Sequence, residues 1–134
     1  MAWGNGEKPV VLIVENEEHQ RILYREELED AGYEVITAAS GPEALEKARQ
    51  HQLDAVVLDI AMPGMDGIEV LARLLDMNRQ LPIIIYTAYA NFREDFTTWA
   101  ARAYVIKSSD PTPLMSALAE AIDGSRATMT TASG

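Results

Sequence analysis

Five short apolar runs alternate with longer amphipathic segments along the chain, and this pattern predicts alternating strands and helices. Three runs are almost continuously apolar, at residues 9–14 (PVVLIV), 55–58 (AVVL) and 82–86 (PIIIY). Runs of this length, rich in β-branched side chains, are typical of strands buried on both faces of a parallel sheet. Residues 33–38 (YEVITA) mix polar and apolar positions and suit a sheet edge, and residues 103–106 (AYVI) form the last predicted strand.

The segments that follow these runs predict helices with recognisable ends. We expect helices over residues 17–31, 40–50, 67–77, 92–100 and 110–124. Residues 40–43 (SGPE) match a capping box, and Asp110-Pro111 suits a helix start. Asp66 can cap the helix at residue 67, and Gly32 and Gly124 are predicted stops. The inner face of the first helix is expected to carry Leu23, Tyr24, Leu28 and Ala31.

Short connections between these elements allow only parallel crossovers, which are almost always right-handed. The sequence therefore predicts an α/β fold with a doubly wound five-stranded parallel sheet. Because the first, third and fourth runs are the most apolar, they are placed at the centre, in the order 2-1-3-4-5. We expect one domain over residues 9–124, an N-terminal extension over residues 1–8, and a flexible tail over the small, polar residues 125–134.

Composition and charge narrow the classes of function. The chain has 134 residues, 48% hydrophobic and 24% charged, which suits one globular domain. Its formal charge of -10 disfavours binding to nucleic acid or to an anionic membrane surface. Cysteine is absent, which excludes disulfides and thiolate metal sites and favours a reducing compartment. With no signal-peptide pattern and no apolar run of ~20 residues, we expect a cytoplasmic protein.

Polar side chains follow the predicted strands where each strand ends. Glu15 and Asn16 follow the first, Asp59 the third, Thr87 the fourth and Lys107 the last. The carboxyl ends of parallel strands meet at one edge of the sheet, where ligands bind in folds of this class. Carboxylate and amide oxygens suit Mg²⁺, while a hydroxyl and an ammonium group can bind phosphoryl oxygens. The pattern favours Asp59 as a nucleophile that forms an acyl phosphate over a plain role in the loop after its strand.

This constellation, with three further marks, resembles the receiver domain of two-component response regulators. The marks are the loop MPGMDG after Leu58-Asp59, the pair Thr87-Ala88 at a strand end, and Tyr104 three residues before Lys107. The resemblance covers about residues 10–124 and implies a flavodoxin-like (βα)₅ receiver fold. It also implies a phosphoryl-accepting switch that catalyses only its own phosphorylation and dephosphorylation, and is otherwise not an enzyme.

The resemblance implies roles for particular residues and partners. A sensor histidine kinase or a histidine phosphotransfer protein would phosphorylate Asp59. The metal ligands for Mg²⁺ would be Glu15, Asn16, Asp59 and the backbone carbonyl of Ala61. Thr87 and Lys107 would contact the phosphoryl group, and Thr87 and Tyr104 would act as switch residues. The surface of the helix at residues 92–100, the last strand and the last helix would then change its affinity for a downstream protein or output domain.

The sequence departs from the family pattern at two site positions. The family usually has an acidic pair after the first strand, whereas Asn16 here is either a cap of the first helix or a weaker ligand, which predicts reduced Mg²⁺ affinity. Ser108 stands where the family usually has a proline after the lysine, so we expect the Lys107–Ser108 peptide bond to be trans. This difference puts the orientation of the Lys107 side chain toward Asp59 in question. Separately, aromatic residues occur at helical spacing in the segment before the last strand, at Phe92, Phe96 and Trp99. This spacing predicts either core packing or an exposed docking surface.

Two other classes of function compete with the phosphorylated switch. A degenerate receiver would bind partners without phosphorylation; Asn16 and Ser108 favour it, whereas Asp59, Thr87 and Lys107 argue against it. An enzyme on the same fold is the other alternative. A dinucleotide-binding protein would require G-x-G-x-x-G after the first strand, where VENEEH has no glycine. An aspartate-based phosphatase would require a second Asp soon after the first, and Ile60-Ala61 offers none.

Overall fold

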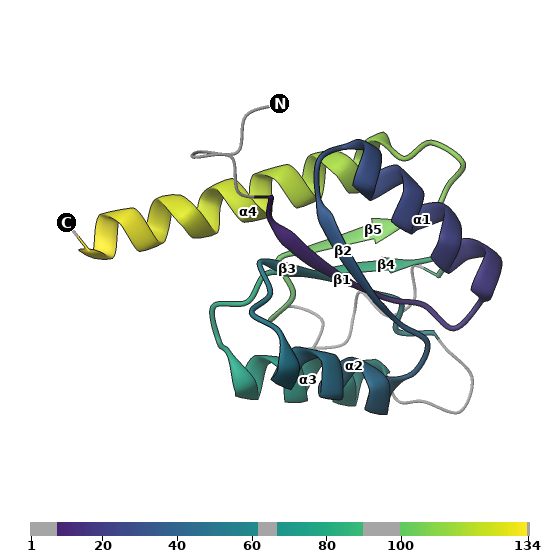
Figure 1. The fold of residues 1–134 in the computed structure, drawn as a ribbon, viewed down its shortest axis with the longest axis horizontal. Helices are drawn as coiled ribbons and strands as arrows, with labels where there is room; N and C mark the ends of the chain where they lie inside the picture. Colours follow the sequence, from purple (N-terminus) through teal and green to yellow (C-terminus); the bar gives the residue numbers. More distant parts are fainter. Residues whose placement is uncertain (1–7, 62–66, 90–99, 134) are drawn as a thin grey trace.

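Five parallel strands form one sheet in the computed structural model, which describes residues 8–61, 67–89 and 100–133 (Figure 1). The strands are β1 (Val10–Val14), β2 (Glu34–Ala38), β3 (Ala55–Leu58), β4 (Ile83–Thr87) and β5 (Ala103–Ile106). Their order is β2-β1-β3-β4-β5, and every neighbouring pair is parallel. The predicted fold class and strand order are confirmed.

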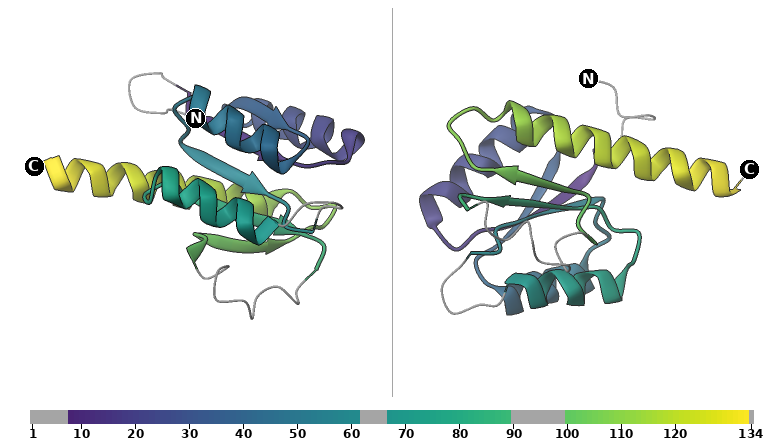
Figure 2. Two further views of the ribbon diagram at one scale, coloured as in Figure 1. Left: turned by 90° about the horizontal axis from the view of Figure 1, so that it is seen from below. Right: turned by 180° about the vertical axis from the view of Figure 1, so that it is seen from behind.

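Helices cover both faces of this sheet. They are α1 (Glu18–Asp30), α2 (Gly41–Gln50), α3 (Gly67–Met77) and α4 (Thr112–Ser133). Figures 1 and 2 show α1 and α4 on one face and α2 and α3 on the other. The helix expected at residues 92–100 lies, apart from Ala100, outside the described residues, as do the aromatic side chains within it and Asp66.

Two hydrophobic clusters hold the helices to the sheet, one on each face. Successive residues of β1 alternate between them: Val11 and Ile13 pack toward α1 and α4, and Leu12 and Val14 toward α2 and α3. Side chains of a strand point alternately to opposite faces, so a central strand covered on both sides requires apolar residues throughout. This requirement explains the continuous apolar runs of β1, β3 and β4.

The ends of the first two helices follow identifiable capping interactions. Glu17 caps α1, because its carboxylate accepts hydrogen bonds from the backbone N–H of His19 (3.2 Å) and of Gln20 (2.9 Å). A cap role for Asn16 is therefore wrong. Gly32 follows α1 at φ 103, a conformation that favours glycine, as expected for the helix stop. The N–H of Glu43 donates to Ser40 Oγ at 3.2 Å, as the capping box predicts.

The last helix differs from its prediction at both ends. It begins at Thr112 rather than at Asp110-Pro111, and Asp110 accepts a hydrogen bond from the Thr112 N–H at 3.0 Å. It continues through Gly124 to Ser133, so residues 125–133, expected as a flexible tail, are helical. An established helix gains one hydrogen bond for each added residue, which lets it pass an interior glycine.

Gly124 lies inside α4 next to Arg102 and does not end the helix. The Arg102 guanidinium lies against α4 there, and its Nη1 donates to the Ala121 carbonyl at 3.3 Å. A Cβ at Gly124 would lie 3.5 Å from that nitrogen, which is ordinary van der Waals contact.

The inner face of α1 is narrower than the sequence predicts. Tyr24 and Leu28 are buried, but Leu23 is 50% exposed and Ala31 is also exposed, so their predicted burial is wrong. A surface helix with a narrow buried stripe leaves its flanking apolar side chains in solvent. None of the helices within the described ranges has the length and apolar character needed to cross a membrane.

Gly67 allows α3 to begin directly against the residue that follows Asp59. A Cβ at position 67 would lie 2.4 Å from Cα of Ile60, closer than two non-bonded carbon atoms can approach. We expect Gly67→Ala to lower the free energy of unfolding by about 2 kcal/mol, because the Ile60 backbone must shift. Urea denaturation followed by circular dichroism measures this change.

Gly124→Ala is the matched control for that experiment. It makes the same chemical change inside a helix but meets only ordinary contacts, so we expect stability unchanged or raised by up to about 1 kcal/mol. Equal losses in both variants would contradict a specific requirement for glycine at position 67.

Candidate functional site

The polar residues predicted to converge lie at the carboxyl edge of the sheet. Glu15 directly follows β1, Asp59 follows β3 and Lys107 follows β5, while Thr87 is the last residue of β4. The register pairs Val14 with Leu58 and Thr87 with Ile106, so the ends are level within each of these two pairs. Leu58 pairs with Ile85, so β4 and β5 extend two residues past the end of β3 at the same edge. Parallel pairing thus brings together residues that are up to 92 positions apart in the sequence.

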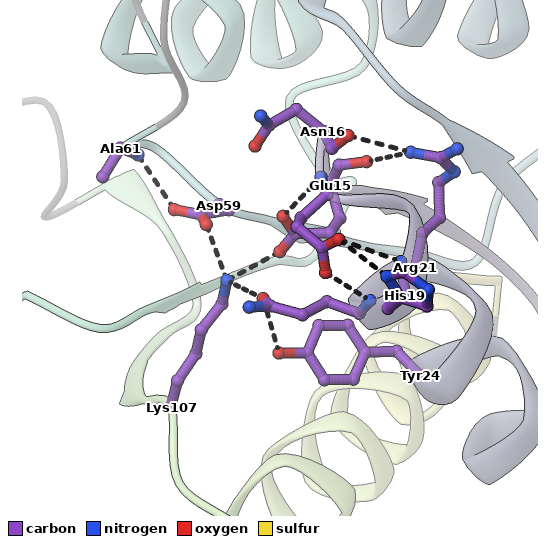
Figure 3. A network of polar contacts seen from close by, with 10 residues as sticks. Glu15, Asn16, His19, Arg21, Tyr24, Asp59, Ala61 and Lys107 are labelled. Carbon is purple, nitrogen blue, oxygen red and sulfur yellow. Dashed lines mark hydrogen bonds and ion pairs between the residues drawn. The ribbon is translucent and has the colours of Figure 1, made fainter.

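Lys107 joins the two carboxylates of this edge directly (Figure 3). Its Nζ lies 2.6 Å from Glu15 Oε1 and 2.7 Å from Asp59 Oδ2. Glu15 is only 2% exposed and Asp59 7%, so both charges are largely removed from water. Buried carboxylates require a cation or hydrogen-bond donors, and Lys107 supplies both.

The environment keeps Lys107 charged. Burial alone would lower the pKa of its ammonium group, but the hydrogen bonds to Asp59 and Glu15 outweigh burial and raise that pKa. No peptide bond in the described residues is cis, so the Lys107–Ser108 bond is trans as expected. Lys107 nevertheless reaches Asp59, and the concern that Ser108 would misdirect it is not supported.

Backbone groups fix the remaining carboxylate oxygens. The N–H of Ala61 donates to Asp59 Oδ1 at 2.9 Å, and the N–H of Glu17 donates to Glu15 Oε2 at 3.1 Å. The described contact of Ala61 is therefore through its N–H, and metal binding by its carbonyl stays a prediction. These bonds hold both carboxylates in one orientation before any ligand binds.

Arg21 secures the loop between β1 and α1 that carries the site. Its Nη1 donates to the carbonyl of Glu15 at 2.9 Å and to that of Asn16 at 3.2 Å. The Asn16 side chain is exposed, and Figure 3 draws the contact of this residue through its backbone. Because Glu17 caps α1, the Asn16 amide is not used as a cap.

Thr87 is fully buried, and within the described part of the chain its hydroxyl has no hydrogen-bond partner. Its backbone carbonyl accepts from the Lys107 N–H at 2.8 Å, so it lies beside the strand end that carries Lys107. An unpaired buried hydroxyl is unfavourable by about 1–3 kcal/mol. A ligand oxygen at this edge would give the Thr87 hydroxyl a partner.

Tyr104 links β5 to the segment after β4. Its hydroxyl donates to the carbonyl of Tyr89 at 2.6 Å, and its ring packs against the cluster beneath α2 and α3. A movement of Tyr104 between two positions stays a prediction.

The donor set suits a hard cation bound by oxygen. It contains two carboxylates, from Glu15 and Asp59, and the neutral amide of Asn16. Among the described residues, no group of three or more His, Cys, Asp or Glu side chains is placed to hold a metal ion.

Two residues of α1 contact the site but were not among the predicted site residues. Gln20 Oε1 accepts from Lys107 Nζ at 2.7 Å and from the Tyr24 hydroxyl at 3.1 Å. Burial raises the pKa of Tyr24 to about 12, so this hydroxyl remains a donor at neutral pH. The available signal was spacing: Gln20, Tyr24 and Leu28 repeat every four residues on one helix face.

Comparisons with known proteins agree with this geometry. The family model for the response regulator receiver domain matches residues 11–119. The alkaline phosphatase synthesis transcriptional regulatory protein PhoP of Bacillus subtilis is 44% identical over 78 residues, covering 58% of this chain and 32% of that protein. The polar-differentiation response regulator DivK of Brucella ovis is 43% identical over 82 residues, covering 60% of this chain and 67% of that protein. The chain thus aligns with about a third of the length of PhoP.

Solved structures give the same likeness across most of the chain. The response regulator TrrA of Thermotoga maritima, in complex with Mg²⁺–BeF, superposes with a TM-score of 0.81 at 39% identity, covering 84% of this chain and 98% of that one. A complex of TrrA with the histidine kinase ThkA gives a TM-score of 0.79 at 39% identity, covering 84% of this chain and 97% of that one.

Replacing Lys107 tests its role as the cation of this cluster. We expect Lys107→Met to lower the free energy of unfolding at neutral pH by about 3 kcal/mol, because Glu15 and Asp59 would stay buried without a cation. This is the lower end of such penalties, since the Lys107 side chain is 14% exposed. Urea denaturation provides the measurement.

Two further variants separate this effect from general damage. Combining Lys107→Met with Asp59→Asn removes one of the two charges and should restore part of the loss, whereas Lys47→Met on α2 should change stability little. Wild-type stability in Lys107→Met would show that the ammonium does not hold the carboxylates together.

Proposed function

Because this chain belongs to the response regulator receiver domain family, we propose that it is a phosphoryl-accepting switch of a two-component system, with Asp59 as the acceptor. One observation carries the proposal: Lys107 lies 2.7 Å from Asp59, at a sheet edge where the buried Thr87 hydroxyl is unpaired within the described residues. A carboxylate can act as the nucleophile in phosphoryl transfer, and a cation and a hydroxyl can stabilise the charge on the phosphoryl oxygens. We assign residues 9–124 to this receiver domain.

The transfer step exchanges one bond to phosphorus for another. A carboxylate oxygen of Asp59 forms a bond to the phosphorus of the donor's phosphohistidine, and the bond from phosphorus to the imidazole nitrogen breaks. The nitrogen retains the electron pair of that bond. Lys107 and Thr87 donate hydrogen bonds to phosphoryl oxygens as their charge redistributes. The Ala61 N–H holds the other oxygen of Asp59 in place.

The residues present fit a magnesium ion, with carboxylates from Glu15 and Asp59, the Asn16 amide and the Ala61 carbonyl as the proposed ligands. When bound, Mg²⁺ supplies positive charge that offsets repulsion between Asp59 and the phosphoryl group. Asn16 contributes an oxygen without a charge, so this chain should require more Mg²⁺ than a relative with two acidic residues there.

The switch itself follows from the contacts of Thr87 and Tyr104. Movement of the Thr87 hydroxyl toward a phosphoryl group would shift the end of β4. Tyr89 lies two residues after Thr87, and its carbonyl accepts a hydrogen bond from the Tyr104 hydroxyl. A shift at the end of β4 would therefore alter this hydrogen bond. We propose that the resulting change reaches the surface formed by β5, α4 and residues 92–100.

The proposed partners are a sensor histidine kinase or a histidine phosphotransfer protein upstream, and a protein partner or output domain downstream. The complex of TrrA with a histidine kinase supports the upstream partner. The absence of cysteine and the acidic charge support a cytoplasmic location without direct nucleic-acid or membrane binding.

Phosphorylation from a small donor tests the proposal directly. We expect incubation with Mg²⁺ and acetyl phosphate to add the mass of one phosphoryl group, and Asp59→Asn to abolish the addition. Asp76→Asn, an exposed aspartate on α3, is the matched control and should retain it. Intact-protein mass spectrometry reads out all three proteins. A wild-type protein without the added mass would favour the alternative of a phosphorylation-independent interaction module.

The charge at position 16 should set the magnesium requirement. We expect Asn16→Asp to lower the Mg²⁺ midpoint of phosphorylation by about tenfold, or about 1.4 kcal/mol, because it adds a carboxylate to the donor set. Isothermal titration with Mg²⁺ alone provides a second readout of the same affinity. Equal midpoints in the two proteins would remove Asn16 from the metal site.

A further inference from the structure

Three oxygen atoms surround the ammonium group of Lys107, and one of them has no part in the proposed chemistry. Two belong to the carboxylates of Glu15 and Asp59. The third is Gln20 Oε1 on α1, at 2.7 Å. An ammonium group has three protons, so each proton of Lys107 has its own acceptor. Gln20 supplies the neutral acceptor of the three.

Gln20 is itself held in place from the same helix. Tyr24, one turn later, donates its hydroxyl to the same amide oxygen at 3.1 Å. Tyr24 is 8% exposed, and its ring packs edge-on against Tyr86 with centroids 5.2 Å apart. The ring centroid lies 5.8 Å from Lys107 Nζ. With two donors directed at one amide oxygen, Gln20 presents that oxygen to Lys107 in a fixed position.

The two carboxylate acceptors must change partners during phosphorylation, whereas Gln20 does not. On the proposed function, Glu15 and Asp59 turn to Mg²⁺ and to the phosphoryl group, so Lys107 loses contacts on that side. A lysine side chain with four flexible carbons and too few acceptors leaves its position readily. A neutral oxygen on a packed helix retains the ammonium without adding negative charge near the phosphoryl group.

We propose that Gln20 is a positioning residue. It holds Lys107 beside Asp59 while Glu15 and Asp59 lose their contacts with Lys107 and bind Mg²⁺ and the phosphoryl group. This inference rests on the proposed function for its role in phosphoryl transfer. The contact with Lys107, however, exists without any ligand, and it can be tested separately.

The first test observes Lys107 in the metal-free protein. The chain has only three lysines, Lys8, Lys47 and Lys107, so signals of lysine ammonium groups in proton–nitrogen correlation spectra are few and are assigned by substitution. An ammonium held by three acceptors exchanges its protons slowly. We expect the Lys107 signal in wild-type protein and its loss or broadening in Gln20→Leu.

The matched control makes the same change where it should not matter. Gln50 on α2 donates to Glu46 at 3.2 Å on an exposed helix face, and α2 covers the face of the sheet opposite α1. Gln50→Leu should leave the Lys107 signal intact. An unchanged signal in Gln20→Leu would overturn the inference, whatever the outcome of the phosphorylation assay.

The second test asks whether Gln20 acts through Lys107. We expect Gln20→Leu to slow phosphorylation by acetyl phosphate about tenfold at saturating Mg²⁺, the effect of one hydrogen bond to a charged group. Tyr24→Phe should slow it less. In a Lys107→Ala background, Gln20→Leu should have no further effect.

These outcomes distinguish a failure of the positioning role of Gln20 from a failure of the proposed function. An equal loss in both backgrounds would show a general structural role for Gln20 and overturn the positioning role. A wild-type protein that accepts no phosphoryl group would overturn the proposed function, while a Lys107 signal that depends on Gln20 would still support the contact on which the inference is built.

Discussion

The bridge that Lys107 makes between Glu15 and Asp59 is the interaction on which the site depends. Three strands contribute these residues, and the bridge can form only when β1, β3 and β5 lie in the correct order and register. Two buried carboxylates near one another repel and lose hydration, and one ammonium offsets both penalties. The cluster retains a net negative charge, which leaves it able to attract a metal ion.

Such a cluster is a compromise between stability and function. Apolar residues in the same positions would avoid the desolvation of three charged groups. The fully buried Thr87 adds a hydroxyl that the described residues leave unpaired. Functional sites commonly retain polar groups whose partners arrive with the ligand. The two layers of packed apolar side chains on either face of the sheet supply the stability that permits this arrangement.

Most of the architecture could be predicted from the sequence because hydrophobic periodicity determines it. The runs of β1, β3 and β4 identify central strands, and the order follows from their burial. Helix ends were less predictable, because a single glycine does not always end a helix: α4 continues past Gly124 to Ser133. At the site, the residues at the strand ends could be predicted, because parallel strand topology brings them to one edge of the sheet. Gln20 was not, because its role depends on where α1 lies over the sheet edge rather than on a motif.

A crystal structure of this chain with Mg²⁺ and beryllofluoride would show whether Asp59, Lys107 and Thr87 form one phosphoryl-binding site. We expect a beryllium fluoride group on the Asp59 carboxylate, with Lys107 Nζ and Thr87 Oγ1 both within hydrogen-bond distance of its fluorine atoms. An unmodified Asp59, with Lys107 still joining it to Glu15 and Thr87 directed elsewhere, would contradict the role of Asp59 as the phosphoryl acceptor.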